Sequence, residues 1–161
     1  MKKNIIWFLP PIVCFIVCFF FISFSRVSGT SMYPNLKNND IILVNKITKK
    51  IERFDVVLIK VEDTVFIKRI IGMPNEEIKY VNNKLYVDDL KINEPFLESN
   101  IKTNDFTIYD ISSKLEDDKY LVLGDNRNNS IDSRIFGLIS SEDIIGKVIF
   151  RVLPFKSFGD I

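Results

Sequence analysis

Residues 124–134 read GDNRNNSIDSR and directly follow a short apolar run at residues 120–123. This polar motif is the most specific one in the chain. It does not fit an EF-hand calcium loop, because a loop starting at Asp125 would have Arg127 at the third position and Ser130, not glycine, at the sixth. Residues 128–130 match the N-glycosylation pattern only formally. Taken alone, the motif indicates a loop held by pairs of Asp and Arg side chains.

Histidine is absent from the 161 residues, which are enough for one globular domain. The chain therefore cannot form a Ser-His-Asp, Cys-His or HExxH site. Its two cysteines, Cys14 and Cys18, lie within an apolar stretch, so the rest of the chain lacks a thiol nucleophile, a disulfide or a thiolate metal site. Covalent hydrolysis would have to use Ser or Thr with Lys, Asp or Glu. We expect no metal and no cofactor.

Charge excludes a further class of partner. The formal net charge is +1, and no long run of one sign suggests an acidic or basic tail. There is thus no electrostatic reason to expect binding to nucleic acid. The oligomeric state is left open by the sequence.

Residues 5–24 carry almost no polar side chain. About 20 apolar residues are what a helix needs to cross a bilayer, so the stretch predicts a transmembrane anchor. A cleaved secretory signal is an alternative, because Ser23-Phe24-Ser25 resembles a small-x-small cleavage site, although its apolar region would be shorter. A buried core helix is a third reading, and apolarity on all faces argues against it.

The flanking charges predict how the anchor is oriented. Lys2 and Lys3 favour a cytoplasmic N-terminus, although Arg26 and Lys37 offset part of this bias. We therefore expect residues 1–4 in the cytoplasm, residues 5–24 across the plasma membrane and residues 25–161 as an extracytoplasmic domain. Membrane lipid is accordingly an expected partner.

The remaining sequence predicts a β-rich domain. Seven runs rich in β-branched and aromatic residues favour strands at 41–44, 55–61, 65–71, 77–81, 84–87, 120–123 and 147–153. Glu62-Asp63 and Asn82-Asn83 lie where hairpin turns are needed. Residues 140–145 could form one helical turn. Residues 98–118 are polar and lack a period, which indicates a loop or a weakly ordered insert.

Two further motifs contain side chains suited to hydrolysis. Residues 28–34 read SGTSMYP, and Ser31 follows the predicted anchor by seven residues, within roughly 25 Å of the membrane surface. Taken alone, this peptide favours a Ser/Gly-rich juxtamembrane turn. Lys68 lies in FIKRIIGMP, residues 66–74, and strand alternation places it on one face with Phe66 and Ile70.

A lysine that acts as a base must be neutral. Its pKa would have to fall from about 10.4 towards 7–8, which burial among apolar side chains can cause. The structural alternative is a lysine that protects an exposed edge strand from aggregation. Taken alone, a single lysine in a strand favours the edge-strand reading.

Together the motifs SGTSMYP, RFDVV at residues 53–57, FIKRIIGMP and GDNRNNSIDSR resemble the type I signal peptidases, membrane-bound Ser-Lys serine proteases. The resemblance covers Ser28 to about Pro154 together with the anchor, and the small size resembles the Gram-positive-bacterial form. It implies a mainly antiparallel β domain with an apolar face on the membrane. It also implies cleavage of signal peptides from exported preproteins after small residues, through an acyl-enzyme.

The resemblance also assigns roles to residues. It implies that Ser31 is the nucleophile and Lys68 the general base. The remaining matches are Ser130 as the hydroxyl that orients the lysine amine, Asp132 and Arg134 as an ion pair under the site, Asp125 and Arg127 as scaffold, and Met32 near the substrate pocket.

One position departs from part of the family. Some members have Ser two residues before the nucleophile, where it donates to the oxyanion, and this chain has Gly29. The identity of a second oxyanion donor is therefore open. Two other classes compete with this interpretation. One is a self-cleaving Ser-Lys repressor, which the apolar stretch and neutral charge argue against, and the other is a non-catalytic relative, which would have lost Ser31 or Lys68.

Overall fold

The computed structural model describes residues 10–11, 21–47, 50–107, 114–159 and 161. Within these ranges the chain forms an antiparallel β structure with only short helices. The strands are β1 (Ile22–Arg26), β2 (Ile41–Asn45), β3 (Val56–Val61), β4 (Thr64–Gly72), β5 (Ile78–Val81), β6 (Lys84–Val87), β7 (Leu90–Ile92), β8 (Phe106–Thr107), β9 (Lys119–Leu123), β10 (Ile139–Ser140) and β11 (Ile144–Leu153). The helical segments are α2 (Ser133–Phe136) and the 3₁₀ turns η2 (Ser141–Asp143) and η3 (Phe155–Ser157).

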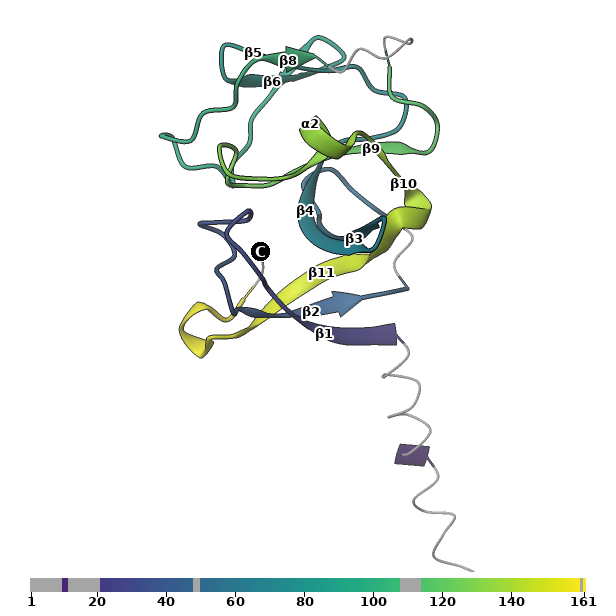
Figure 1. Ribbon diagram of the computed structural model, residues 1–161, viewed down its shortest axis with the longest axis vertical. Helices are drawn as coiled ribbons and strands as arrows, with labels where there is room; N and C mark the ends of the chain where they lie inside the picture. Colours follow the sequence, from purple (N-terminus) through teal and green to yellow (C-terminus); the bar gives the residue numbers. More distant parts are fainter. Residues whose placement is uncertain (1–9, 12–20, 48–49, 108–113, 160) are drawn as a thin grey trace, which may run out of the picture.

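The strands form two sheets. The larger has the order β1-β2-β11-β3-β4-β9-β10, and the smaller has the order β7-β6-β5-β8. Figure 1 shows the small sheet at one end of the molecule, β1 and β2 at the other, and the strongly curved β3 and β4 between them. In the chain, the small sheet is an insertion between β4 and β9, two neighbouring strands of the large sheet. The insertion therefore starts and ends beside β4, the strand that carries Lys68.

All seven predicted strands are confirmed, with boundaries shifted by up to three residues. Both predicted hairpin turns are also present, and Glu62, Asn82 and Asn83 have the positive φ that tight turns require. The interpretation of Lys68 as an edge-strand residue is wrong, because β4 lies between β3 and β9. The helical turn expected at 140–145 is limited to η2, since β11 starts at Ile144.

Other short elements were missed. Strands β1, β7, β8 and β10 and helix α2 were not predicted, because runs of two to five residues carry too little periodicity to be recognised. Strand β8 lies within residues 98–118, which were expected to be a loop, and it pairs with β5. Residues 108–113 of that stretch lie outside the described residues.

The predicted membrane anchor lies mostly outside the described residues. Ile22–Phe24, its last three residues, form strand β1 together with Ser25 and Arg26 and pair with β2. Within the described ranges, no helix has the length and apolarity needed to span a membrane.

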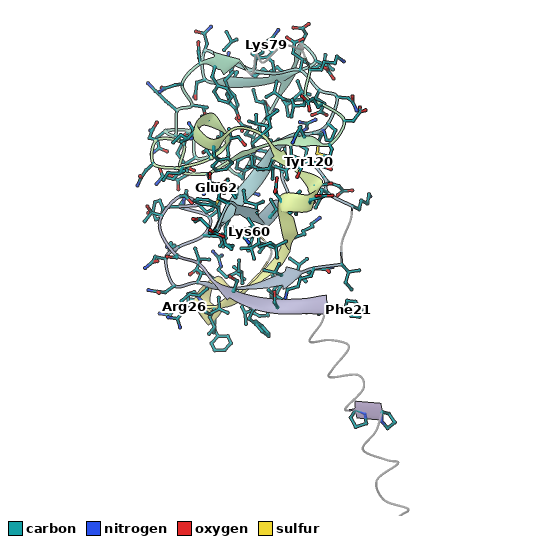
Figure 2. All side chains as sticks on the ribbon, turned by 45° about the vertical axis from the view of Figure 1, so that its right-hand side comes forward. Phe21, Arg26, Lys60, Glu62, Lys79 and Tyr120 are labelled. Atoms are coloured by element: carbon teal, nitrogen blue, oxygen red, sulfur yellow. The ribbon has the colours of Figure 1, made fainter. Side chains whose placement is uncertain are left out.

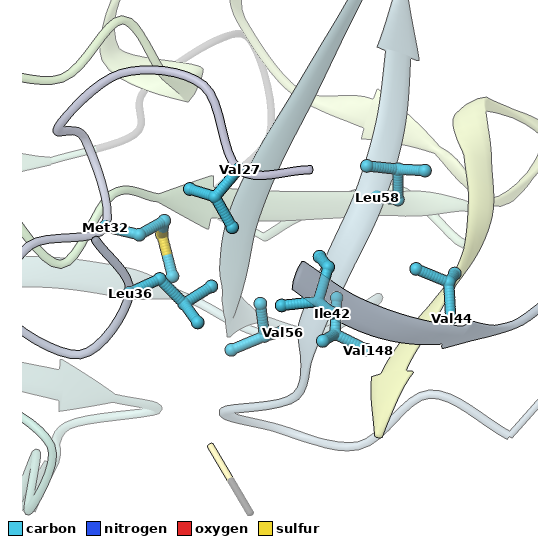
Figure 3. Close-up of a cluster of buried hydrophobic side chains, with 8 residues drawn as sticks. All are labelled: Val27, Met32, Leu36, Ile42, Val44, Val56, Leu58 and Val148. Carbon is cyan, nitrogen blue, oxygen red and sulfur yellow. The ribbon is translucent and has the colours of Figure 1, made fainter. Parts of the chain in front are cut away.

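Three clusters of buried apolar side chains form the core. The one nearest β1 contains Val27, Met32, Leu36, Ile42, Val44, Val56, Leu58 and Val148 (Figure 3). Three of its members, Val27, Met32 and Leu36, come from the segment around Ser31. Their burial fixes that segment against the large sheet, although the segment itself is a turn and not a strand.

We expect Ile42→Ala to lower the free energy of unfolding by about 2–5 kcal/mol, because Ile42 is fully buried at the centre of this cluster and its truncation leaves a cavity. Denaturant titration of the purified chain measures the change. The matched control is Leu90→Ala, whose side chain is 69% exposed and should cost less than about 0.5 kcal/mol. Equal losses for both variants would contradict the assigned core.

Candidate active site

Ser31 lies in a turn and Lys68 in strand β4, and their side chains are in contact. Hydrogen bonds from the backbone N–H groups of Tyr33 and Leu36 to the Thr30 and Met32 carbonyls shape the turn. The Lys68 Nζ donates a hydrogen bond of 2.8 Å to the Ser31 Oγ. Residues that are 37 positions apart in the sequence are thus placed so that a neutral amine could take the hydroxyl proton directly.

Lys68 is 2% exposed. Burial lowers the pKa of its ammonium group from the usual value to about 8, although the charges of Asp132 and Asp125 act in the opposite direction. The Phe66 ring lies 5.4 Å from the Nζ and supplies part of the apolar surrounding. In the part of the chain that the structure describes, Lys68 takes part in no ion pair.

Both carboxylates near Lys68 are bound by arginines. Asp125 accepts two hydrogen bonds from Arg69, of 2.8 Å from Nε and 2.7 Å from Nη2. Asp132 is bound in the same bidentate way by Arg134, at 2.8 and 2.7 Å. Because each carboxylate already has a cation, neither serves as the counterion of Lys68, and the lysine is left free to lose its proton.

Asp132 also holds the backbone of the 124–134 motif. It caps helix α2 and accepts a hydrogen bond of 3.0 Å from the Gly124 N–H. Burial alone would raise the pKa of Asp132, but the hydrogen bonds from Arg134 and Gly124 outweigh it and hold the pKa below its usual range. The carboxylate therefore remains charged at neutral pH and keeps the motif in place.

The motif contacts the Ser31 segment directly. The Asn126 N–H donates to the Ser31 carbonyl at 2.9 Å, and the Asn126 Nδ2 donates to the Thr30 carbonyl at 3.1 Å. Gly124 permits this approach, because a Cβ at that position would lie 2.5 Å from the Ser31 carbonyl oxygen. Any side chain there would push the Ser31 segment away.

Ser130 lies at the same place, but among the described residues its buried Oγ forms no hydrogen bond of ordinary geometry with Lys68 or with any other group. It is close enough to the Asp132 carboxylate to contribute to the lowered pKa of that group. A Cβ on Gly124 would lie 2.2 Å from the Ser130 Oγ, so Ser130 packs at the place where Gly124 approaches the Ser31 carbonyl. The hydrogen bond to the lysine amine that the family resemblance implies is not seen in this structure.

The backbone around Gly29 bears on oxyanion binding. Gly29 has a φ of +90°, in the region that favours glycine, and its N–H donates to the Asn38 side chain at 3.0 Å. That N–H is therefore already used within the protein. The Ser31 N–H is bonded to no acceptor in the described ranges, so it remains available to a substrate oxygen.

A cleft of about 190 Å³ opens in front of Ser31. One wall is formed by residues 25–29, which end strand β1 and lead to the turn, and the other by residues 65–68 of β4. Met32 and Leu58 lie at its base, so Met32 both lines the cleft and belongs to the core.

Several residues around the site were not singled out from the sequence. Arg69 was only the neighbour of Lys68 in its motif, and the alternation of strand β4 was not enough to reveal its pairing with Asp125, 56 positions away. Asn35, which donates to Asp125 and to the Phe96 carbonyl, gave no signal. Arg127 was expected in the scaffold, but its partners are the distant residues Tyr80, Glu94 and Thr103.

Comparison with known proteins identifies the family of this chain. Residues 2–153 match the family model described as signal peptidase, peptidase S26. The chain is 37% identical to signal peptidase IB of Staphylococcus aureus strain COL over 98% of this chain and 94% of the relative. This chain belongs to the signal peptidase family.

Further relatives support the family assignment. Signal peptidase I of Bacillus caldolyticus is 38% identical over 95% of this chain and 91% of the relative. The crystal structure of a signal peptidase I from Enterococcus faecalis V583 superposes with a TM-score of 0.55 at 31% identity, covering 62% of this chain and 97% of that one. Membership in the signal peptidase family makes the chain a serine endopeptidase, as the motifs indicated.

The burial of Lys68 has a consequence for stability that is independent of catalysis. Its folded pKa of about 8 lies below the unfolded value, so the folded state resists the charged form. The resulting loss in the free energy of unfolding is complete at pH values below the folded pKa and disappears as pH rises through the unfolded pKa. Relative to Lys68→Met, the free energy of unfolding of the wild type should therefore rise by roughly 2–3 kcal/mol between pH 7 and pH 10.

Urea unfolding of both proteins at the two pH values measures this difference. Lys60→Met is the matched control, because Lys60 is exposed on β3, and its difference from wild type should not change with pH. A pH-independent difference between wild type and Lys68→Met would show that the lysine pKa is not lowered.

Proposed function

We propose that this protein is a membrane-anchored endopeptidase that removes signal peptides from exported preproteins with a Ser31–Lys68 dyad. The observation that carries the proposal is the 2.8 Å hydrogen bond between the amine of a buried lysine and the hydroxyl of Ser31. The chain has no histidine that could act instead. The relatives named signal peptidase supply the substrate class.

The proposed mechanism begins with neutral Lys68. Its Nζ takes the Ser31 proton as the Oγ attacks the scissile carbonyl, and the Ser31 N–H donates to the oxyanion that forms. The ammonium then gives the proton to the leaving amine, and the mature protein departs. Lys68, again neutral, takes a proton from the water that attacks the acyl-enzyme. The Lys68 ammonium then returns a proton to the Ser31 Oγ as the ester bond breaks, which releases the signal peptide and restores the neutral amine.

Ser130 has a defined place in this scheme. Once Ser31 is acylated, its Oγ is an ester oxygen and a poor partner for the amine of Lys68. Ser130 has a buried hydroxyl that is packed beside Gly124 and the Ser31 carbonyl and lies close to the Asp132 carboxylate. We assign it the orientation of the amine during deacylation.

The cleft supports an extended substrate. Residues 25–29 and 65–68 border it on two sides, and an extended peptide laid between them could form backbone hydrogen bonds with both. Alternate side chains of such a peptide would point into the cleft. Cleavage after small residues is what the resemblance to type I signal peptidases implies.

Membrane anchoring rests on the sequence of residues 5–24 and on the surface near β1. Phe24, Phe155 and Phe158 are exposed by 58–79%, which is unusual for large aromatic side chains. They come from β1 and from the segment after β11. Figure 2 shows Phe21 and Arg26 at opposite ends of β1, at the end of the molecule far from Lys79 of the small sheet.

Replacement of either dyad residue should abolish processing. We expect Ser31→Ala and Lys68→Ala to lower kcat/KM for a preprotein by at least about 10³-fold, while both variants remain folded. Cleavage of a preprotein by the full chain in proteoliposomes is the assay. Lys60→Ala, at an exposed lysine of the neighbouring strand, should retain normal activity. More than about a tenth of wild-type activity in Lys68→Ala would refute the assignment of the base.

The pH dependence of catalysis should report Lys68. Because only the neutral amine is active, kcat/KM for a substrate without titratable groups should rise with pH and level off above about pH 8. Two pH units below that value, activity should be about 100-fold lower. A profile that is flat between pH 6 and pH 9 would exclude this lysine as the base.

A further inference from the structure

Arg127 is completely buried, and its guanidinium is held mainly by residues of the small-sheet insertion. Its Nη1 donates to the Tyr80 hydroxyl at 2.9 Å and to the Thr103 hydroxyl at 2.7 Å. Its Nη2 forms an ion pair with Glu94, whose side chain is 8% exposed. A buried guanidinium of this kind needs a charged partner, and in the described part of the chain Glu94 is the only carboxylate that pairs with it.

Glu94 is in turn held in one orientation. Its Oε1 accepts a hydrogen bond of 2.6 Å from the Tyr80 hydroxyl as well as the contact from Arg127. Burial raises the pKa of Tyr80 well above its usual range, so the hydroxyl keeps the proton that it donates to Glu94. Tyr80 itself is 1% exposed and packs in the core cluster between the two sheets.

Arg127 also contacts the turn formed by residues 124–127, beside Ser31. The Nε of its side chain donates to the Gly124 carbonyl at 3.2 Å, and its backbone N–H donates to the Asp125 carbonyl at 3.0 Å. The same turn presents the Asn126 N–H to the Ser31 carbonyl. The position of the Arg127 guanidinium is therefore linked, through one rigid turn, to the backbone of the proposed nucleophile.

The segment after Glu94 also contacts residues that bind Asp125, next to the Ser31 turn. The Phe96 ring lies 4.2 Å from the Arg69 guanidinium, and the Phe96 carbonyl accepts a hydrogen bond from Asn35. Both partners bind the Asp125 carboxylate. Loop residues 94–96 thus touch two of the arginines that surround the site, although they belong to the insertion and do not line the cleft.

We propose that Glu94 is a positioning residue of the endopeptidase site, which acts through Arg127 to hold turn 124–127 against the Ser31 backbone. The inference rests on the proposed Ser31–Lys68 dyad for its catalytic consequence. Without the Glu94 charge, the Arg127 guanidinium has no neutralising partner and must move or draw water into the interior. The turn then loses the fixed point that keeps the Asn126 N–H on the Ser31 carbonyl.

The test compares Glu94→Gln with Glu76→Gln in the full chain. Glu76 is a matched control, because it belongs to the insertion and also forms a partly buried ion pair, with Arg53 of the large-sheet part, but among the described residues it has no hydrogen bond or ion pair with turn 124–127. We expect Glu94→Gln to lower kcat by about 10- to 100-fold, with KM changed less than about threefold, since a misplaced nucleophile affects the chemical step. Glu76→Gln should leave kcat unchanged.

Amide hydrogen exchange gives a readout that does not depend on activity. The Asn126 amide should exchange at least about tenfold faster in Glu94→Gln than in wild type, and at the wild-type rate in Glu76→Gln. Faster exchange at Asn126 combined with full activity of Ser31→Ala would sink the proposed dyad while leaving the positioning link intact. The two proposals can therefore fail separately.

If Glu94→Gln fails to fold, Tyr80→Phe tests the same positioning role. It removes only the hydroxyl that contacts Glu94 and Arg127, and a several-fold loss of kcat with faster Asn126 exchange is the expected result. Unchanged kcat and unchanged Asn126 exchange in the folded variants would overturn the proposal. A loss of kcat in Glu76→Gln as large as in Glu94→Gln would also overturn it, because general destabilisation would then be the cause.

Discussion

Lys68 must be buried beside Ser31 without a counterion of its own, and the rest of the structure is arranged around that requirement. Burial lowers the lysine pKa to about 8, against the pull of two nearby carboxylates. Those carboxylates, Asp125 and Asp132, are each held in a bidentate pair by an arginine. The arginines keep the acids from pairing with the lysine, and the acids keep the arginines from adding uncompensated charge to the site.

Both sheets contribute contacts that stabilise this arrangement. The large sheet supplies Lys68 and Arg69 on adjacent positions of β4, whose opposite faces bury the lysine next to Ser31 and the arginine next to Asp125. The core around Ile42 fixes the turn that carries Ser31 (Figure 3). The small sheet, inserted between β4 and β9, holds the polar motif from the other side through Arg127. The site therefore depends on packing contributed by both sheets.

The sequence predicted the strands with clear β-branched runs and both hairpin turns, because local patterns carry that information. It also predicted the fold class, through the order of four motifs. What it did not contain was the pairing of Arg69 with Asp125 or of Arg127 with Glu94, since both pairs join positions more than 30 residues apart. The motif GDNRNNSIDSR has two Asp residues that are each followed two positions later by Arg, which predicts local ion pairs. The prediction is correct for Asp132 with Arg134 but not for Asp125, which pairs with Arg69 and not with Arg127.

The pKa of the Lys68 amine in the folded protein tests the central claim most directly. It can be followed by NMR of the full chain carrying ¹³C-labelled lysine, with the Lys68 signal assigned by comparison with Lys68→Met. The account predicts a titration midpoint at about pH 8, both in the wild type and in Ser31→Ala. A midpoint near the ordinary lysine value of about 10.4 would contradict it, because too little neutral amine would then exist at neutral pH to serve as the base.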